Sequence, residues 1–344
     1  MSNPILTDAI DALASGRSLS QETAAAVLRE IMAGDAGEVE IAGFLIALRT
    51  KGENEEELAG LASTMRALAV PVKSRRDDLL DTAGTGGGRT TFNVSTTAAL
   101  IAAGAGCAVA KHGNRSATSL SGSADVLEAL GARLDVGAAG VGRCIDEVGF
   151  GFMFAPAHHQ ATRFVVPVRK ELAVRTIFNF LGPLTNPAGA RRQLIGVADP
   201  DFLDVMAGAL ARLGIDRALL VSSEDGLDEI STSGATHVVE VNATAIERYT
   251  VTPEDLGVPR SSFDAVAGGT PQENAAATRG ILAGEPGPKR DIAVVNGGAA
   301  IYAAGRAGSL AEGVQQAVEA IDSGAAAASL SGYVRLSEEL AGLL

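Results

Sequence analysis

The chain has 344 residues, of which 47% are hydrophobic and 20% charged, so it can bury a substantial core and is not a disordered protein. Its 28 Lys and Arg against 41 Asp and Glu give a net charge of −13, which disfavours general binding to nucleic acid or to anionic membranes. With two cysteines, Cys107 and Cys144, a disulfide framework and a thiolate zinc site are excluded. The start of the chain resembles no signal peptide and no stretch is apolar enough to span a membrane, so we expect a soluble cytoplasmic protein.

The first 70 residues predict helices only. Ser20 is placed to cap a helix over residues 23–32, which Gly34 ends, and Asn54 precedes three glutamates at the start of a helix that runs to Leu68.

After Pro71 the pattern changes to short apolar runs that alternate with alanine-rich helical windows. The strand-like runs are residues 79–82, 107–110, 193–197 and 218–221, and the helical windows between them include 96–103 and 202–213. Residues 236–240 and 247–251 indicate a strand pair, and residues 309–321 and 330–343 indicate two closing helices. The alternation predicts a mostly parallel sheet covered by helices.

We therefore expect an α/β protein of two domains. Residues 1–70 together with about 168–190, a strand-poor insertion, would form a small helical domain. Residues 71–167 with 191–344 would form a larger α/β domain around the central sheet.

A glycine-rich loop, Gly84-Thr85-Gly86-Gly87-Gly88, follows a predicted strand and precedes a predicted helix. Such a loop can direct several backbone N–H groups at an anion, or it can be a turn without a ligand. Its spacing matches neither a Walker A loop nor a dinucleotide fingerprint, so neither ATP nor NAD is indicated. The next residues, 93–96, either cap a helix or offer side-chain oxygens to phosphate or a metal.

Residues 111–116 (KHGNRS) form the densest polar cluster and follow a predicted strand, where ligands bind in open α/β sheets. They suit a second phosphate cradle, and the alternative is a solvated loop. Asp228 and Glu229 are adjacent carboxylates of the kind that binds Mg²⁺, or part of an acidic turn.

His158 and His159 follow an apolar stretch, and because adjacent residues diverge, they do not suit a shared metal. The pattern favours a structural contact. Arg169 could clamp a substrate carboxylate or form a surface ion pair.

Taken in this order, these segments resemble the anthranilate phosphoribosyltransferase family. The matching stretches are residues 81–96, 111–131, 154–159, 168–187 and 225–231. The family transfers the phosphoribosyl group of 5-phosphoribosyl 1-diphosphate (PRPP) to anthranilate and releases diphosphate, the second step of tryptophan biosynthesis from chorismate. The resemblance implies a fold of the nucleoside phosphorylase and phosphoribosyltransferase type, two Mg²⁺ ions, and a homodimer formed through the helical domain.

The resemblance also implies roles for individual residues. It places PRPP at Gly84, Gly87, Gly88, Thr91, Asn93, Val94, Ser95, Thr96, Lys111, His112, Gly113, Asn114, Arg115, Ser116, Ser119 and Ser123. It places anthranilate at Gly84, Asn114, His112, His159 and Arg169, and Mg²⁺ at Ser95, Asp228 and Glu229. No residue is assigned as acid or base; Lys111, His112 and Arg169 would position the substrates, because an aromatic amine is unprotonated at neutral pH and the acceleration comes from alignment.

Two positions depart from the family pattern. The family loop usually continues from its glycines into an Asp and is one residue longer, whereas Gly88-Arg89 stands here; Thr162 stands where a Tyr is often found. Replacing an acid by a cation repels Mg²⁺, so we expect the ion beside Ser95 to bind weakly and to arrive mainly with the substrate. Arg89 either contacts the diphosphate in a closed state or is a solvated residue at the loop tip.

Two alternative functions stay open. A nucleoside phosphorylase of the same broad fold would use inorganic phosphate and would not need Asp228 and Glu229. A non-catalytic relative would bind nucleic acid or a phosphorylated effector, which the net charge of −13 disfavours.

Overall fold

The computed structural model describes residues 2–116 and 120–341 of the chain. Its described part contains a seven-stranded sheet in the order β3-β2-β1-β4-β5-β6-β7. The strands are β1 (Leu79–Gly84), β2 (Ala108–Gly113), β3 (Phe150–Phe154), β4 (Arg192–Gly196), β5 (Arg217–Ser223), β6 (Thr236–Asn242) and β7 (Ala245–Val251). The first five in this order pair in parallel, and β6 and β7 are antiparallel. The mostly parallel α/β sheet is thus confirmed.

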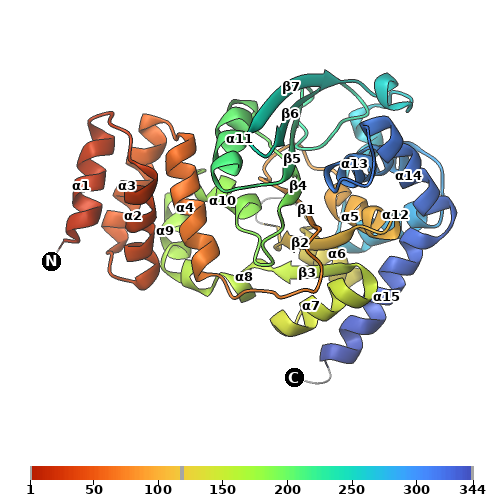
Figure 1. Cartoon of the computed structure of the whole chain (residues 1–344), viewed down its shortest axis with the longest axis horizontal. Coiled ribbons are helices and arrows are strands. Elements are labelled where there is room, and N and C mark those ends of the chain that lie inside the picture. The colour runs from red at the N-terminus through yellow and green to blue at the C-terminus, as the bar shows by residue number, and fades with distance from the viewer. Residues whose placement is uncertain (1, 117–119, 342–344) are drawn as a thin grey trace.

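Helices cover both faces of the sheet and form one end of the molecule (Figure 1). The α-helices are α1 (Pro4–Ala14), α2 (Gln21–Ala33), α3 (Glu38–Lys51), α4 (Glu55–Leu68), α5 (Val94–Gly104), α6 (Ser123–Ala129), α7 (Gly137–Val148), α8 (Ala155–His158), α9 (Val166–Leu172), α10 (Phe178–Leu184), α11 (Leu203–Arg212), α12 (Pro271–Leu282), α13 (Pro288–Ala303), α14 (Leu310–Asp322) and α15 (Ala325–Ala341). Short 3₁₀ helices are η1 (Gln160–Phe164), η2 (Pro200–Phe202), η3 (Glu254–Leu256) and η4 (Phe263–Val266). No helix in the described part of the chain is long and apolar enough to cross a membrane.

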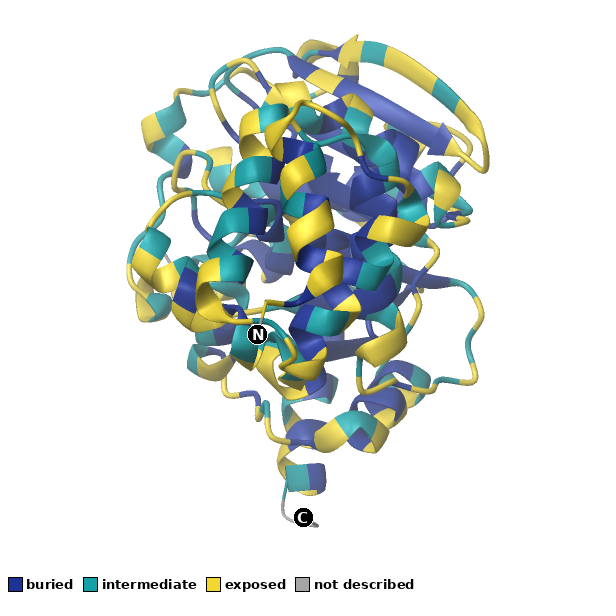
Figure 2. Cartoon of the chain, turned by 90° about the vertical axis from the view of Figure 1, so that its left-hand side faces the viewer, coloured by how far each residue is buried: buried dark blue, intermediate teal, exposed yellow. Residues whose placement is uncertain are grey.

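Helices α1–α4 form the helical end, and their caps follow the sequence. The Ser20 hydroxyl accepts the N–H of Thr23, and the Asn54 side chain accepts the N–H of Glu57. Gly34 ends α2 in the left-handed conformation, at a φ of 84°. Buried and exposed residues alternate around these helices, as Figure 2 shows from the helical end.

The inner faces of these helices share one core with the sheet. It runs from Leu6 in α1 through Leu58 in α4 and Leu181 in α10 to Leu210 in α11 and Leu220 in β5. A second core lies between the other face of the sheet and α5, α13 and α15. The insertion packs on the helical end, since α9 contacts α3 and α10 contacts α4; η1, just before it, contacts α2. Because the first core is continuous, packing alone marks no boundary at residue 70, and the division into two domains stays a prediction.

Strand β2 is longer than the sequence predicts. It continues to Gly113, so Lys111 and His112 are strand residues and not members of the following loop. The reason is the parallel pairing with β3, in which Lys111 lies opposite Phe152 and His112 opposite Met153. The sequence did not predict β3.

Candidate functional site

Lys111 is a buried cation at the carboxyl end of β2, with 2% of its surface exposed. Its ammonium group donates to the carbonyl and the hydroxyl of Thr82 in β1, the latter at 3.2 Å, and lies 3.4 Å from the hydroxyl of Ser95 at the start of α5. Burial lowers the pKa of Lys111 to about 8, while Asp81 and Glu229 favour its charged form. Lys111 therefore links the ends of two strands to the start of a helix.

The glycine-rich loop after β1 is held by its own backbone. The N–H of Thr85 donates to the Gly196 carbonyl at 2.8 Å, and the backbone N–H of Gly86 favours the charged form of Asp228. A side chain at Gly88 would bring its Cβ to 2.8 Å from an Asp228 carboxylate oxygen, so this close approach requires glycine. The loop thus lies directly against the segment that carries the two predicted metal ligands.

Asp228 and Glu229 are adjacent, partly buried carboxylates in the segment that follows β5. Burial raises the pKa of both, that of Glu229 to about 8, and the charge of Asp228 adds to the latter shift. The backbone N–H of Ser95 and the ammonium group of Lys111 both favour the charged form of Glu229. A divalent cation would offset this unfavourable pairing of negative charges, so the donor set fits Mg²⁺. Among the residues described, no group of three or more His, Cys, Asp or Glu could hold a metal, so hydroxyl, water or substrate oxygens would complete the shell.

Ser95 lies at the start of α5, where free backbone N–H groups favour an anion. Asn93, just before it, donates from its amide to the Ser121 carbonyl and accepts from Asn274, so its side chain braces the helix start. The hydroxyl of Thr96 is buried without a partner in the described part of the chain. Of the predicted residues 93–96, Asn93 is therefore already hydrogen-bonded to other described residues of the protein, whereas the hydroxyl of Thr96 is not.

Asp81 and Asn186 were not predicted as site residues, yet they fix the end of β2. One oxygen of Asp81 accepts the N–H of His112 at 3.0 Å, and the other accepts the Asn186 amide at 2.7 Å. Asn186 also donates to the Ala110 carbonyl at 2.8 Å. Burial raises the pKa of Asp81 to about 6. The signal in the sequence is an acid inside an apolar strand.

His112 and His159 lie side by side with their ring centroids 5.1 Å apart. Nδ1 of His112 is 3.1 Å from the Gly182 carbonyl, and the Nε2 atoms of both rings are buried without a partner among the described residues. Burial lowers the pKa of His112 to about 3 and that of His159 to about 4, so both rings are neutral. A structural contact was expected for His158 and His159. His158 makes one, because its Nδ1 lies 2.9 Å from the Val70 carbonyl oxygen.

Arg169 in α9 is half-buried and has no ion pair among the described residues. Its guanidinium lies 5.5 Å from the centre of the Phe178 ring, and burial lowers its pKa. An unpaired, partly desolvated arginine is suited to bind a carboxylate.

In the loop after β2, the predicted site residues that the structure describes make hydrogen bonds and ion pairs with other residues of the protein. Arg115 forms ion pairs with Asp125 and Glu128 at 2.8 and 2.6 Å, so its charge is already matched. Ser123 donates to the Asn114 carbonyl. The backbone N–H of Ser116 donates to Asp125. Ser119 lies outside the described residues.

Three further arginines make contacts at or near the glycine-rich loop. Arg175, between α9 and α10, donates to the Gly86 carbonyl at 3.2 Å, and Arg49 in α3 donates to the Arg175 carbonyl at 2.9 Å. Arg89 places its guanidinium carbon 3.4 Å from the centre of the Phe263 ring. None of these three contacts was predicted, because each joins segments far apart in the chain.

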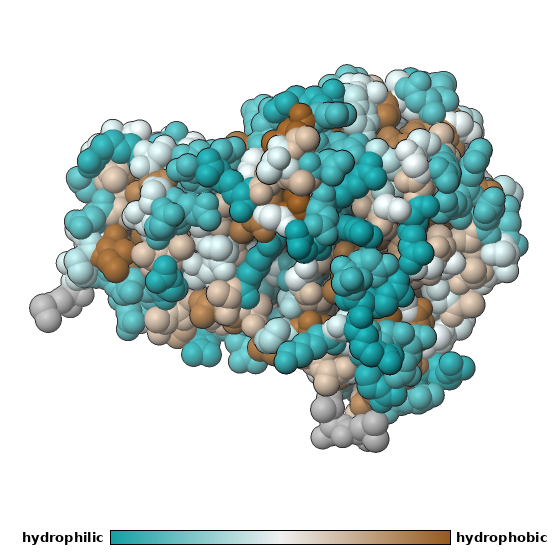
Figure 3. Space-filling view, in the orientation of Figure 1, coloured by the Kyte–Doolittle hydropathy of each residue, from teal (hydrophilic) through white to brown (hydrophobic). Residues whose placement is uncertain are grey.

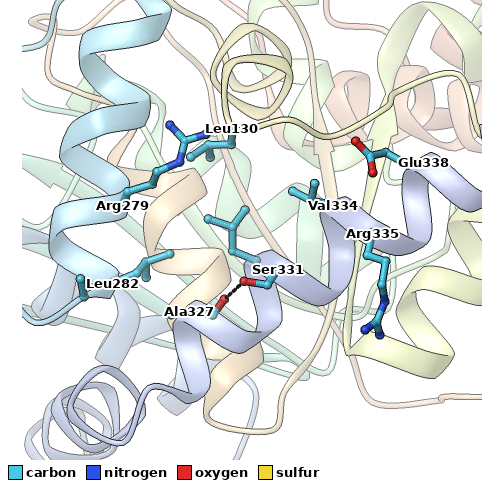
Figure 4. A pocket seen from close by; sticks show the side chains of 10 residues that line it. Leu130, Arg279, Leu282, Ala327, Ser331, Val334, Arg335 and Glu338 are labelled. Atoms are coloured by element: carbon cyan, nitrogen blue, oxygen red, sulfur yellow. Dashed lines mark hydrogen bonds between the residues drawn. The ribbon is translucent and has the colours of Figure 1, made fainter.

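A surface groove of about 400 Å³ lies elsewhere, between α12 and α15 (Figure 4). Its lining consists of Leu130, Arg279, Leu282, Ala283, Ala327, Leu330, Ser331, Val334, Arg335 and Glu338. None of the predicted site residues belongs to it. The polar cluster at the strand ends remains the candidate site.

Comparison with known proteins shows similarity over most of the chain. The model of the "Glycosyl transferase family, a/b domain" matches residues 76–327, and that of the "Glycosyl transferase family, helical bundle domain" matches residues 7–69. The chain is 51% identical over 315 residues to the anthranilate phosphoribosyltransferase of Symbiobacterium thermophilum, covering 91% of this chain and 92% of the relative.

Solved structures show the same likeness. The crystal structure of anthranilate phosphoribosyltransferase from Thermus thermophilus is 48% identical, with a TM-score of 0.92 over 96% of this chain and 99% of that one. The enzyme of that name from Saccharomyces cerevisiae, in complex with PRPP and Mg, is 28% identical, with a TM-score of 0.89 over 98% and 99% of the two chains.

Proposed function

The chain belongs to the anthranilate phosphoribosyltransferase family, and we propose that the polar cluster at the strand ends is where it carries out this family's reaction. The enzyme transfers the 5-phosphoribosyl group from PRPP to the amine of anthranilate. The products are N-(5-phosphoribosyl)anthranilate and diphosphate, and the reaction is the second step of tryptophan biosynthesis from chorismate.

The observation that carries the proposed site is the position of Lys111. It lies between the end of β1 and the start of α5, next to Ser95 and near Glu229, where the glycine-rich loop also ends. Departure of diphosphate places negative charge on the leaving group. A buried cation and the N–H groups of a glycine loop and a helix start stabilise such charge without reorganisation.

Asp228, Glu229 and the Ser95 hydroxyl would hold magnesium, of which we propose two ions. Mg²⁺ supplies charge neutralisation for the diphosphate when it is bound. The residues of this chain contribute the site's geometry: Asp228 lies against Gly84 and Gly88 of the glycine-rich loop, and Lys111 and the Ser95 backbone N–H favour the charged form of Glu229.

Anthranilate would lie between His112, His159 and Arg169, with Asn114 and Gly84 beside it. Two neutral imidazoles with unpartnered nitrogens can accept the N–H groups of an aromatic amine, and Arg169 can bind the carboxylate. The amine attacks without a strong base, because it is unprotonated at neutral pH. Most of the rate acceleration then comes from holding the two substrates in line for the reaction.

Loss of anthranilate fluorescence tests the function directly. We expect the signal to fall when protein, anthranilate, PRPP and Mg²⁺ are mixed, and to persist when Mg²⁺ is left out. Lys111→Ala should lower turnover and raise the PRPP KM more than the anthranilate KM. Turnover of a nucleoside with inorganic phosphate and without metal would favour the nucleoside phosphorylase instead, and retention of single-stranded DNA on a filter would favour a nucleic-acid binder.

Three broader features belong to the same proposal. The enzyme is a homodimer formed through its helical end, where Ile5, Val39 and Ile46 expose apolar side chains. It has a helical domain of residues 1–70 with 168–190 against an α/β domain of the rest. It works in the cytoplasm, in keeping with two cysteines that are both unpaired and buried.

A further inference from the structure

Arg89 stands at one of the two positions where the sequence departs from the family pattern, and its contacts in the structure have a defined geometry. The guanidinium carbon lies 3.4 Å from the centre of the Phe263 ring, which is the distance of a close cation–π stack. Nη1 of Arg89 also donates to the Asp225 carbonyl at 3.3 Å. The Arg89 backbone N–H donates to the Gly226 carbonyl at 3.1 Å. Side chain and backbone of one residue thus hold the same turn.

That turn is itself rigid, because Asp225 collects four donors. Its carboxylate accepts the hydroxyls of Ser223, Ser231 and Ser233 and the N–H of Leu227. These bonds tie the turn to the end of β5 and to the segment after Glu229. Arg89 is therefore attached to a fixed support and not to a mobile loop.

Phe263 is a fixed support as well. It begins η4 and packs against the core beneath the sheet. The same segment meets the far end of the glycine-rich loop, since the N–H of Phe92 donates to the Val266 carbonyl at 3.3 Å and Thr91 forms a bridge with Ala267. The loop, the Asp225 turn and η4 meet at one junction, and Arg89 lies in its centre.

We propose that Arg89 is a positioning residue whose stack on Phe263 clamps the glycine-rich loop to the segment of Asp228 and Glu229. The clamp keeps the diphosphate-binding loop and the metal-binding carboxylates in one arrangement before substrates bind. This role rests on the proposed function in naming what the two segments bind. The clamp differs from a direct contact with diphosphate. In the clamp, Arg89 stacks its planar guanidinium on the Phe263 ring; in a direct contact, its positive charge would bind the anion.

Hydrogen exchange of the substrate-free protein tests the clamp without any assay of activity. Arg89→Ala and Phe263→Leu should each speed deuterium uptake at the Arg89 amide by about two- to fivefold, the range of an exposed cation–π contact. The Thr85 amide, which is bonded to Gly196 at the other end of the loop, should exchange at an unchanged rate. Arg248→Ala is the control, because it removes an exposed arginine of β7 that pairs with Asp204 and has no hydrogen bond or ion pair to the Asp225 turn or to η4 among the described residues. Unchanged exchange in Phe263→Leu would overturn the proposal.

Steady-state kinetics separate the clamp from a direct phosphate contact. If Arg89 is a clamp, then Phe263→Leu raises the PRPP KM and the half-saturating Mg²⁺ concentration as much as Arg89→Ala does, and the double variant is no worse than either single one. Arg89→Lys, which keeps the charge and loses the flat group, should resemble Arg89→Ala. Wild-type values in both Phe263→Leu and Arg89→Lys would show a charge contact and refute the clamp. A wild-type protein inactive on anthranilate would refute the proposed function, whereas the exchange experiment would still decide the clamp.

Discussion

Substitution of Arg169 should affect the KM for anthranilate far more than the KM for PRPP. We expect Arg169→Ala to raise the anthranilate KM roughly ten- to a hundredfold, since a charge-assisted hydrogen bond contributes ~1.5–3 kcal/mol. The PRPP KM should change little. Arg163→Ala is a suitable control, because this exposed neighbour stacks on Phe164 at 4.7 Å. Initial rates measured over both substrates check the expectation, and an unchanged anthranilate KM would contradict the assignment.

The pair of His112 and His159 predicts how stability depends on pH. Burial depresses both pKa values, with further contributions from neighbouring His158 and, for His112, from His159 and Lys111. Unfolded histidine titrates near 6.5, so the unfolded chain binds more protons as the pH falls from 6.5 towards the folded values of about 3 and 4. The stability contributed by the neutral rings is complete above pH 6.5 and is lost on acidification.

One variant is enough to measure how much unfolding free energy each histidine costs on acidification. Between pH 7 and pH 5 each histidine should cost about 2 kcal/mol of unfolding free energy. His159→Gln should therefore lose about 2 kcal/mol less than the wild type over this range, whatever its stability at pH 7. Denaturant unfolding at the two pH values gives the comparison, and equal losses in both proteins would mean that His159 is charged in the folded state.

At the scale of elements, the insertion joins the helical end to the glycine-rich loop through Arg175. Arg175→Ala should raise the PRPP KM about fivefold, the equivalent of about 1 kcal/mol for a hydrogen bond to the Gly86 carbonyl. Arg49→Ala should act in the same direction and less strongly, because Arg49 holds only the Arg175 carbonyl. Lys170→Ala removes an exposed cation from the same insertion and should have no effect. An equal PRPP KM for Arg175→Ala and the wild type would show that the Arg175 side chain does not support the glycine-rich loop.

The elements divide clearly into those that local sequence determines and those that it does not. The caps at Ser20 and Asn54 and the strands at β1, β4 and β5 follow from residues within a few positions, and they were predicted. Strand β3 and the extension of β2 depend on each other, because each completes the other's hydrogen bonds. A single-sequence pattern cannot indicate such a pairing.

The same distinction applies to the site. Lys111, Ser95 and the pair Asp228 and Glu229 follow strand ends, and parallel strands bring their carboxyl ends together, so this convergence could be predicted. The contacts of Arg89 and Arg175 could not, since they depend on where η4 and the insertion pack.

At the scale of the whole molecule, the helical end carries the exposed apolar surface that a homodimer would bury. Val39 is 86% exposed and Ile46 is 38% exposed, and their spacing of seven residues puts them on one face of α3. Ile5 at the start of the neighbouring α1 is also 38% exposed. Figure 3 shows a group of hydrophobic residues at this end, on a face where hydrophilic and hydrophobic residues are mixed.

Val39→Arg should convert a dimer into a monomer, because a buried unpaired charge in an interface costs several kcal/mol. Light scattering after size exclusion should give about twice 34.8 kDa for the wild type and the single mass for the variant. Val39→Thr keeps the size of the side chain without a charge and should stay dimeric. A wild type of the single mass, or a dimer that persists in Val39→Arg, would place the contact between subunits elsewhere. The candidate site lies at the strand ends, and its residues come from one chain, so we expect the monomeric variant to keep its affinity for PRPP.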